Sequence, residues 1–181
     1  YECDVEKAKE LLAEAGYPDG IELELWTPVG RYLMDTQVCE NLQAQWEKAG
    51  IKVKIRQWEF QALMSEIKKG EFDMILLGWS PSTGDADQGL YPVFHSSQFP
   101  PNSNRAFYNN SQVDQLLENS KTEVDENKRM EMYKEAEQII MDEAPWTFLY
   151  YPKQALTYRS NISGIEMLPT EHILFEKAVK R

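Results

Sequence analysis

An alternation of strand-like and helix-like segments in the first half of the chain constrains its fold most strongly. Apolar and charged residues alternate strictly over Ile21–Leu25 and Ile51–Ile55, which is the pattern of half-buried strands. Between about 32 and 49, and again over 60–69, the apolar residues recur at helical spacing. A third strand is expected over Asp73–Trp79, where an apolar run indicates burial on both faces. This order predicts an α/β fold with a mixed or parallel sheet flanked by helices.

Capping residues mark further helices outside this alternation. Each is an Asp or Ser that stands at the start of a segment with helical periodicity, where its side chain can accept from free backbone amides. The helices expected in this way are 5–15 after Asp4, 111–121 at Ser111 and 126–142 after Asp125. A short helix is expected over Gln88–Phe94, and the segments "APWTFLYYP" and "QALTYR" favour short strands.

Charge and composition exclude several classes of partner. The formal net charge of -11 argues against nucleic acids and against anionic membrane surfaces, both of which require clustered Lys and Arg. No apolar run approaches the roughly 20 residues that span a bilayer. The sequence begins at Tyr1 rather than Met, so we expect a piece of a longer chain whose export signal lies upstream. Two free cysteines are expected, with a Cys3–Cys39 bridge as the alternative.

Loops that leave the three expected strand ends carry the candidate binding residues. In an open α/β sheet, ligands lie outside the carboxyl ends of the strands. The first loop offers the cation Arg31, the second the aromatic Phe60, and Arg105 lies in a later polar loop. The third loop, "GWSPSTGDADQ", supplies Trp79, Ser80, Ser82, Thr83, Asp85 and Asp87. Together these groups suit a small zwitterionic ligand, although core packing of the rings and ion pairing of the arginines are structural alternatives.

The carboxylates of Asp85 and Asp87 allow other interpretations. They could form an acid–base pair of a hydrolase, or open a calcium loop, but no Glu stands at the twelfth position of that loop, which is Ser96. No known catalytic or nucleotide-binding motif accompanies these aspartates: the chain contains no nucleophile elbow, P-loop, dinucleotide fingerprint or zinc-protease motif. We therefore expect no catalysis, metal or cofactor, and a helix cap near Gln88 as the structural alternative. A protein-interaction domain is a further alternative for the function of the chain.

Six segments taken in order resemble the C-terminal part of the extracellular solute-binding proteins of peptide ABC importers. They are "DVEKAKELLAEAGYPDG", "NLQAQWEKAGIKVKI", "KKGEFDMILLGWS", "AFYNNSQVDQLL", "RMEMYKEAEQIIMDEAPWTFLYYPK" and "NISGI". The resemblance implies one lobe of a two-lobed periplasmic-binding-protein fold of class II, with residues 1–164 as the lobe and 165–181 as a tail returning to the other lobe. It also implies an extracytoplasmic monomer, either periplasmic or a surface lipoprotein, that delivers a short peptide to permease subunits.

The resemblance also assigns roles to individual positions. It places Phe60, after Glu59, in the wall of the ligand pocket and Trp79 at the cleft. Ser82 stands where dipeptide and oligopeptide receptors carry an Asp for the peptide amine, and the usual carboxylate-binding Arg falls near Thr36, so Arg31 would substitute for it. The Ser/Thr-rich loop with two aspartates is most similar to the glutathione-binding type. A receptor for nickel or another small solute is the alternative within the family.

Overall fold

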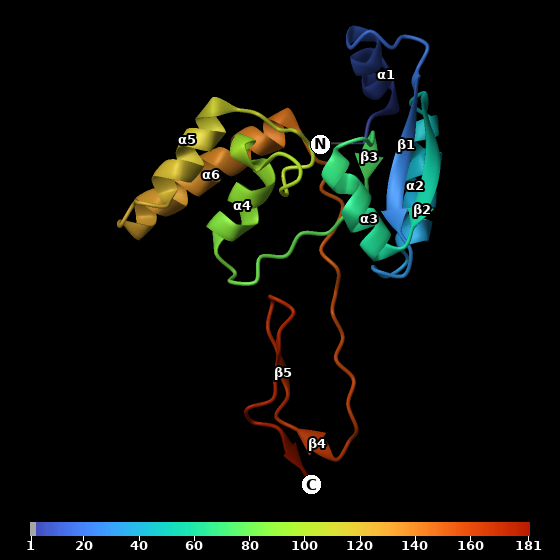
Figure 1. Cartoon of the computed structure of the whole chain (residues 1–181). Coiled ribbons are helices and arrows are strands. Elements are labelled where there is room, and N and C mark those ends of the chain that lie inside the picture. The colour runs from blue at the N-terminus through green and yellow to red at the C-terminus, as the bar shows by residue number, and fades with distance from the viewer. Residues whose placement is uncertain (1–2) are drawn as a thin grey trace. The chain divides into compact units, whose positions relative to one another are not determined.

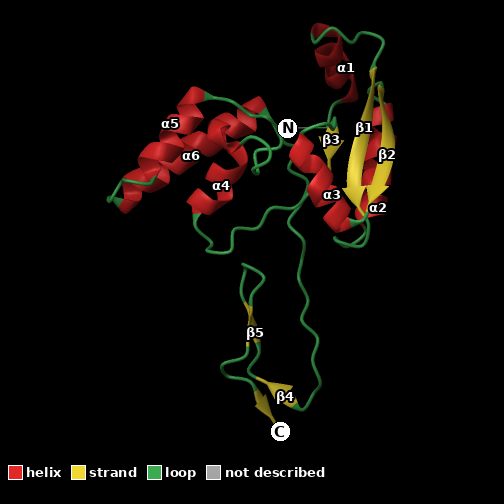
Figure 2. Ribbon diagram, viewed as in Figure 1, coloured by secondary structure: helices red, strands yellow, loops and turns green. Residues whose placement is uncertain are grey.

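The structure, a computed structural model, describes residues 3–181 and separates into two compact units. The first unit ends at Gly78 and the second begins at Trp79. Figure 1 labels helices and strands of both units, and Figure 2 distinguishes helices, strands and loops by colour.

The first unit is built on a three-stranded parallel sheet with the order β2-β1-β3. Strand β1 (Ile21–Pro28) pairs along its whole length with β2 (Ile51–Trp58), and its centre pairs with β3 (Met74–Ile75). The prediction of an α/β fold is therefore confirmed. The third strand is shorter than the predicted Asp73–Trp79, because only two of its residues pair with β1 and the apolar residues that follow are held by packing.

Helices cover both faces of this sheet. On one face, α2 (Asp35–Glu47) packs over Leu25 and contributes the fully buried Cys39. On the other face, Trp26 packs against α3 (Phe60–Glu66) and the short 3-10 helix η1 (Ile67–Lys69), which supply the fully buried Leu63 and Ile67. Leu25 and Trp26 serve different faces because adjacent residues of a strand point in opposite directions. Helix α1 (Val5–Glu14) has no buried residue.

The second unit contains a helical core. Helices α4 (Ala86–Phe94), α5 (Ser111–Ser120) and α6 (Glu126–Glu143) pack together, with the 3-10 helix η2 (Ser96–Gln98) after α4. The buried apolar residues of this core, of which Tyr108 comes from the loop before α5, are Leu90, Val93, Phe94, Tyr108, Val113, Leu117, Tyr133, Ala136 and Ile140. The caps Asp4 and Asp125 are confirmed, since each side chain accepts from amides of the first helical turn. The cap predicted at Ser111 is wrong: Asn110 accepts from two amides, and Ser111 is the first helical residue.

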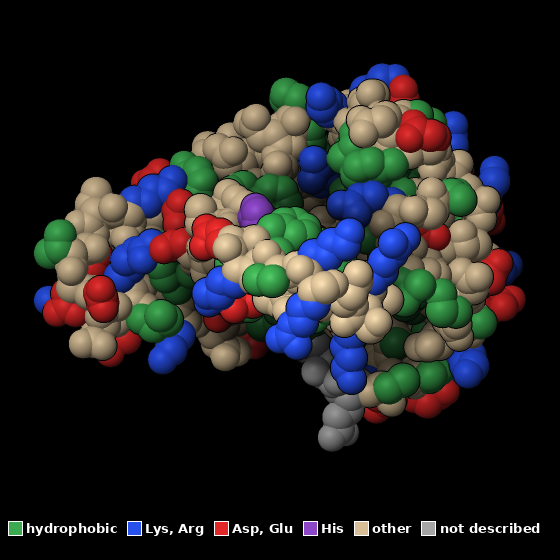
Figure 3. All heavy atoms as spheres, turned by 90° about the horizontal axis from the view of Figure 1, so that it is seen from below, with side chains coloured by type: hydrophobic (Ala, Val, Ile, Leu, Met, Phe, Trp, Pro, Cys, Tyr) green, Lys and Arg blue, Asp and Glu red, His purple; other side chains and the backbone are tan. Residues whose placement is uncertain are grey.

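Residues 145–159 form no strand within the part of the chain that the structure describes, so the strands predicted for "APWTFLYYP" and "QALTYR" are wrong there. A strand exists only where its backbone groups pair with another strand, and aromatic residues of high strand propensity do not supply that partner. Several apolar side chains of the segment are exposed, among them Phe148, Tyr150 and the fully exposed Tyr151. Hydrophobic side chains lie at the surface among charged ones in Figure 3.

Two short antiparallel ladders end the chain. Strand β4 (Ile162–Ser163) pairs with β7 (Val179–Lys180), and β5 (Glu166–Met167) pairs with β6 (Ile173–Leu174). Both cysteines are free, as predicted, with Cys39 buried and Cys3 exposed. Among the described residues, no helix combines the length and apolar character needed to cross a membrane.

Candidate functional site

The loop between β1 and α2 is held by a buried carboxylate. Asp35 is 4% exposed and accepts hydrogen bonds from the backbone amides of Arg31 at 3.0 Å, Tyr32 at 3.2 Å and Thr36 at 2.9 Å. A carboxylate that satisfies local amides in this way fixes the path of the backbone. The turn that carries Arg31, at the carboxyl end of β1, is therefore held in one conformation by Asp35.

The side chain of Arg31 lies against two aromatic rings. Its guanidinium carbon is 5.1 Å from the ring centroid of Tyr32 and 5.1 Å from that of Phe60. No acidic side chain of the described residues lies within ion-pair distance of Arg31. Ring faces attract a cation without using its N–H groups, so the planar donor fork of Arg31 is left for another partner.

Phe60 is placed by the start of α3. The carboxylate of Glu59 caps this helix by accepting from the amide of Ala62 at 3.0 Å, and backbone amides hold the pKa of Glu59 below its ordinary value. Phe60 follows this cap directly and is half-buried. The structure thus brings together Arg31 and Phe60, which the sequence analysis predicted separately.

Tyr32 is a candidate residue that the sequence analysis missed. Its hydroxyl oxygen accepts a hydrogen bond from the amide of Gly78 at 2.8 Å, although the two residues are 46 positions apart. A Cβ atom at position 78 would lie 3.2 Å from the ring of Tyr32, so a glycine lets the end of the β3 segment pass closely under the ring. The only sequence signal was the position of Tyr32 next to Arg31 in a strand-end loop.

In the second unit, the loop before α4 is organised around the side chain of Gln88. The amide oxygen of Gln88 accepts from the hydroxyl of Ser82 at 3.2 Å and from the backbone amide and hydroxyl of Thr83, both at 2.9 Å. The amide nitrogen of Gln88 donates back to the Ser82 hydroxyl at 3.1 Å. The predicted ligand donors Ser82 and Thr83 are therefore engaged within the loop, and Gln88 was not among the predicted residues.

Trp79 and Ser80 lie at the start of the same loop. The indole nitrogen of Trp79 donates to the backbone oxygen of Gln88 at 3.0 Å, and its side chain remains 38% exposed. Ser80 is exposed. The loop thus fixes the orientation of the indole while leaving part of its apolar face accessible.

Both aspartates of the loop have structural partners. Asp85 caps α4 by accepting from the amide of Asp87 at 2.8 Å, which confirms the capping alternative, and it accepts from the guanidinium of Arg129 at 2.7 Å. The hydrogen bond from Arg129 holds the pKa of Asp85 below its ordinary value. Asp87 lies in the first turn of α4, 4.0 Å from the ammonium of Lys121. Within residues 3–181, no three His, Cys, Asp or Glu side chains are grouped to hold a metal ion.

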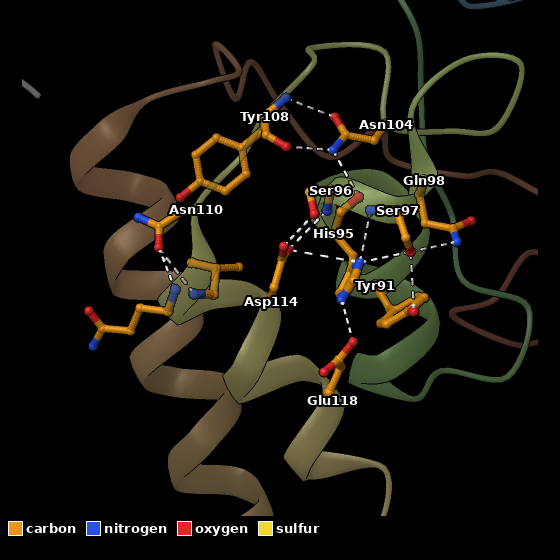
Figure 4. Close-up of polar contacts among 12 residues, drawn as sticks. Tyr91, His95, Ser96, Ser97, Gln98, Asn104, Tyr108, Asn110, Asp114 and Glu118 are labelled. Atoms are coloured by element: carbon orange, nitrogen blue, oxygen red, sulfur yellow. Dashed lines mark hydrogen bonds and ion pairs between the residues drawn. The ribbon is translucent and has the colours of Figure 1, made fainter.

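A polar network holds the loop between α4 and α5, as Figure 4 shows. His95 is 4% exposed, and its Nδ1 accepts from the backbone amide of Ser97 at 3.1 Å while its Nε2 lies 3.2 Å from Glu118. Asn104, which is fully buried, bonds the backbone of His95 and of Tyr108. Arg105 follows Asn104 and is half-buried. This loop is thus fixed by its own polar side chains together with Asp114 and Glu118 of α5.

The predicted site residues fall into separate groups. Arg31 and Phe60 meet in the first unit, whereas Trp79, Ser82, Thr83 and Asp85 surround Gln88 or the start of α4 in the second. Arg105 belongs to the loop before α5. Each of these loops is held by its own set of local hydrogen bonds.

Comparisons with known proteins agree on one family. The sequence model described as "Bacterial extracellular solute-binding proteins, family 5 Middle" matches residues 1–101. The glutathione-binding protein GsiB of Salmonella choleraesuis is 36% identical over 181 residues, an alignment that covers 97% of this chain and 35% of the relative. This chain therefore spans about a third of that relative's length.

Two solved structures are similar in both sequence and fold. The oligopeptide-binding protein AppA of Bacillus subtilis, in complex with a nonapeptide, superposes with a TM-score of 0.81 at 31% identity, covering 93% of this chain and 35% of AppA. The periplasmic binding protein DppA of Helicobacter pylori, in complex with the peptide STSA, gives a TM-score of 0.74 at 34% identity. That match covers 80% of this chain and 28% of DppA. The fold is that of periplasmic peptide-binding proteins.

Proposed function

Because this chain belongs to the family 5 bacterial extracellular solute-binding proteins, we propose that it is part of the receptor of an ABC importer and binds a short peptide. The named relatives bind glutathione, the peptide STSA and a nonapeptide, which supports peptides as the ligand class. The receptor binds its ligand without chemical change and delivers it to permease subunits outside the cytoplasm, as a monomer. A glutathione-like or other di- or oligopeptide fits this proposal.

The observation that carries the proposal is the cluster of Arg31, Tyr32 and Phe60 at the carboxyl end of the sheet. A cation held by ring faces and free of acidic partners among the described residues is suited to a ligand carboxylate. The position agrees with the rule that ligands of open α/β sheets lie beyond the carboxyl ends of the strands. Phe60 and Trp79 offer apolar faces for ligand side chains.

The other predicted residues have secondary roles in this proposal. Ser80 is exposed and can donate to the ligand, and Arg105 supplies a second cation. Ser82 and Thr83 contribute mainly to the loop's shape, because Gln88 already satisfies their hydroxyl groups. Asp85 and Asp87 likewise hold the start of α4 before they meet any ligand amine.

The remainder of the receptor supplies the second lobe. In this proposal residues 1–164 form the ligand-binding lobe, and residues 165–181 form the tail that returns to the other lobe. Phe148, Leu149, Tyr150 and Tyr151 are consecutive in the chain and exposed, which supports this arrangement because clustered exposed apolar side chains mark interaction regions. Ligand binding then favours closure of the lobes, since the ligand contacts both of them only in the closed form.

A thermal-shift assay on the full-length receptor tests the function. Glutathione, dipeptides, longer peptides and Ni²⁺ are added separately, and a ligand at 100 times its Kd stabilises the folded receptor by about 2.7 kcal/mol. We expect at least one peptide to raise the melting temperature by several degrees. A shift with Ni²⁺ alone would indicate a metal receptor, and turnover of the peptide would indicate a hydrolase. No shift with any peptide would refute the proposal.

A further inference from the structure

An interior proline of α4 leaves the carbonyl oxygen of Gln88 without its usual helical partner. In an α-helix, the backbone amide of each residue donates to the carbonyl oxygen four residues earlier, and proline has no amide proton. Pro92 lies inside α4, four residues after Gln88. The Gln88 oxygen therefore receives no hydrogen bond from position 92 and is available to another donor.

The indole of Trp79 supplies that hydrogen bond. Its Nε1 donates to the backbone oxygen of Gln88 at 3.0 Å. An indole N–H can only donate, so the position of this acceptor sets the orientation of the ring. The side chain of Trp79 is still 38% exposed, so the bond fixes the ring without burying it.

The side chain of Gln88 holds the segment between Trp79 and α4. Gln88 is the third residue of the helix, a position from which Gln commonly bonds back to the amide of the capping residue. Here the Thr83 hydroxyl accepts from the amide of the cap Asp85 at 3.2 Å, and the Gln88 side chain reaches further, to the amide and hydroxyl of Thr83. A backbone amide can only donate, so the oxygen of the Gln88 side chain faces Thr83, and the nitrogen donates to the Ser82 hydroxyl at 3.1 Å.

The segment held by Gln88 borders a hollow of the second unit. The hollow has a volume of about 640 Å³, within the range of small-ligand pockets. Its lining includes Ser82 and Thr83 from this segment and the apolar Leu168 and Leu174 from the β5–β6 hairpin. The conformation of the segment therefore determines the shape of a space in which a peptide side chain can lie.

We propose that Gln88 is a positioning residue for peptide binding and that Pro92 acts with it by freeing the Gln88 carbonyl for Trp79. This inference rests on the proposed function and adds two residues that act on the ligand through others. The backbone oxygen of Gln88 orients the exposed face of Trp79, and its side chain orders Ser82 and Thr83. Because these groups are ordered before the peptide arrives, less conformational entropy is lost on binding.

Pro92→Ala separates this role from a contribution to folding. The new residue has a backbone amide that can donate to the Gln88 carbonyl and so competes with the indole of Trp79. Alanine also suits a helix interior better than proline, so we expect the melting temperature without peptide to stay the same or rise. We expect the Kd for peptide to increase about 10-fold, because Trp79 must then be ordered by the ligand.

Variants of Gln88 test the side chain. Gln88→Met keeps the length of the side chain and removes its amide, and we expect the Kd to increase about 10-fold. The melting temperature should change little, because Ser82 and Thr83 are exposed and can bond to water. Gln88→Glu keeps an acceptor for the amide and hydroxyl of Thr83, so we expect this variant to retain most of the wild-type affinity.

A double-mutant cycle assigns the effect of Pro92 to the indole. Trp79→Phe keeps an aromatic ring and removes the N–H that bonds the Gln88 carbonyl. In the Trp79→Phe background we expect Pro92→Ala to cause no further increase in the Kd, since the competing donor is already gone. An equal increase in both backgrounds would show that Pro92 acts elsewhere and would overturn its part in the inference.

Calorimetric titration of the full-length receptor measures these effects. The probes are glutathione, dialanine and trialanine, and each variant is titrated with those that wild type binds. Gln138→Met is the control for Gln88→Met, because Gln138 is an exposed residue of α6 whose amide bonds Asp142 outside the loop. Pro18→Ala, at an exposed turn of the first unit, is the control for Pro92→Ala. Both controls should keep the wild-type Kd.

Each outcome bears on a different step. Wild-type Kd values for both Gln88→Met and Pro92→Ala overturn the inference while peptide binding stands. A loss of affinity in Gln88→Met that comes with a large fall in the melting temperature without peptide also overturns it, because Gln88 would then support the fold. If no probe binds to wild type, the proposed function fails, and the inference fails with it.

Discussion

Asn104 is the residue whose replacement most directly tests how the loop between α4 and α5 is held. Its side chain is fully buried, and its amide nitrogen donates to the backbone oxygens of His95 at 3.0 Å and Tyr108 at 2.8 Å. Its amide oxygen accepts from the backbone amide of Tyr108 at 3.1 Å (Figure 4). One side chain thus satisfies three backbone groups that have little access to water.

The structure sets the size of the effect of Asn104→Ala. Each of the three hydrogen bonds contributes about 1 kcal/mol net, which gives about 3 kcal/mol, and the backbone groups left without partners raise the loss towards about 5 kcal/mol. That is a large part of the roughly 5–15 kcal/mol by which a typical domain is stable. We therefore expect Asn104→Ala to unfold at a much lower urea concentration.

Asn104→Asp separates shape from hydrogen bonding. The new carboxylate keeps the acceptor for Tyr108 but faces two backbone oxygens that need donors. Burial and these oxygens raise the folded-state pKa of the new group above its unfolded value of about 3.9. A raised pKa favours folding of the protonated form, so the variant loses most stability at pH 8 and regains part of it as the pH falls through the folded-state pKa.

Urea titrations followed by circular dichroism at pH 8 and pH 5 measure both variants. Asn102→Ala is the matched control, because Asn102 lies exposed in the same loop. A loss below about 1 kcal/mol in Asn104→Ala would refute the reasoning, since a single net hydrogen bond would then account for the whole effect. So would an Asn104→Asp variant whose stability relative to Asn104→Ala is the same at both pH values.

Three further predictions concern the second unit. Asp85→Ala should lower the melting temperature more than Asp85→Asn, because Asn can still cap α4 although it loses the ion pair with Arg129. Since Arg129 lowers the pKa of Asp85, the advantage of wild type over Asp85→Ala should be present at neutral pH and fade as the pH falls through that lowered value. The hydroxyl of Tyr108 and the side chain of Asn110 lower the pKa of Glu143, so the melting temperatures of wild type and Tyr108→Phe should converge on acidification from pH 7 to pH 3. Leu117→Ala should lower the free energy of unfolding, measured by urea titration, by about 2–5 kcal/mol, because Leu117 is fully buried. Leu116→Ala, at a half-buried position of the same helix, is the control and should cost less.

The elements that the sequence predicted well depend on local rules. Alternation over Ile21–Leu25 and Ile51–Ile55 located the two long strands, and a parallel sheet followed from the helices between them. Asp4 and Asp125 were recognised as caps because the amides they satisfy lie two or three residues away. In the same way Asp85 was an expected cap of α4.

The features that the sequence did not predict depend on contacts between distant residues. Tyr32 meets Gly78 across 46 positions, and Arg129 meets Asp85 across 44. Neither pair has a spacing that a periodic pattern would reveal. The aromatic segment of residues 145–159 shows the opposite error, because high strand propensity predicted strands for which the described residues provide no partner.

The candidate site shows why polar composition alone is a weak guide to binding chemistry. The loop "GWSPSTGDADQ" carries most of the hydroxyl and carboxylate groups that suggested a ligand, yet three of them are already engaged: Ser82 and Thr83 by Gln88, and Asp85 as the cap of α4. If these groups had to break their bonds within the loop to reach a ligand, the net free energy of binding would be smaller. A loop that is already ordered, however, avoids part of the entropic cost of binding. Arg31 and the Tyr32 proton have no such partners in the described chain. Discrimination between ligands should therefore depend on Arg31 and Tyr32, while the loop contributes a fixed surface and the exposed face of Trp79.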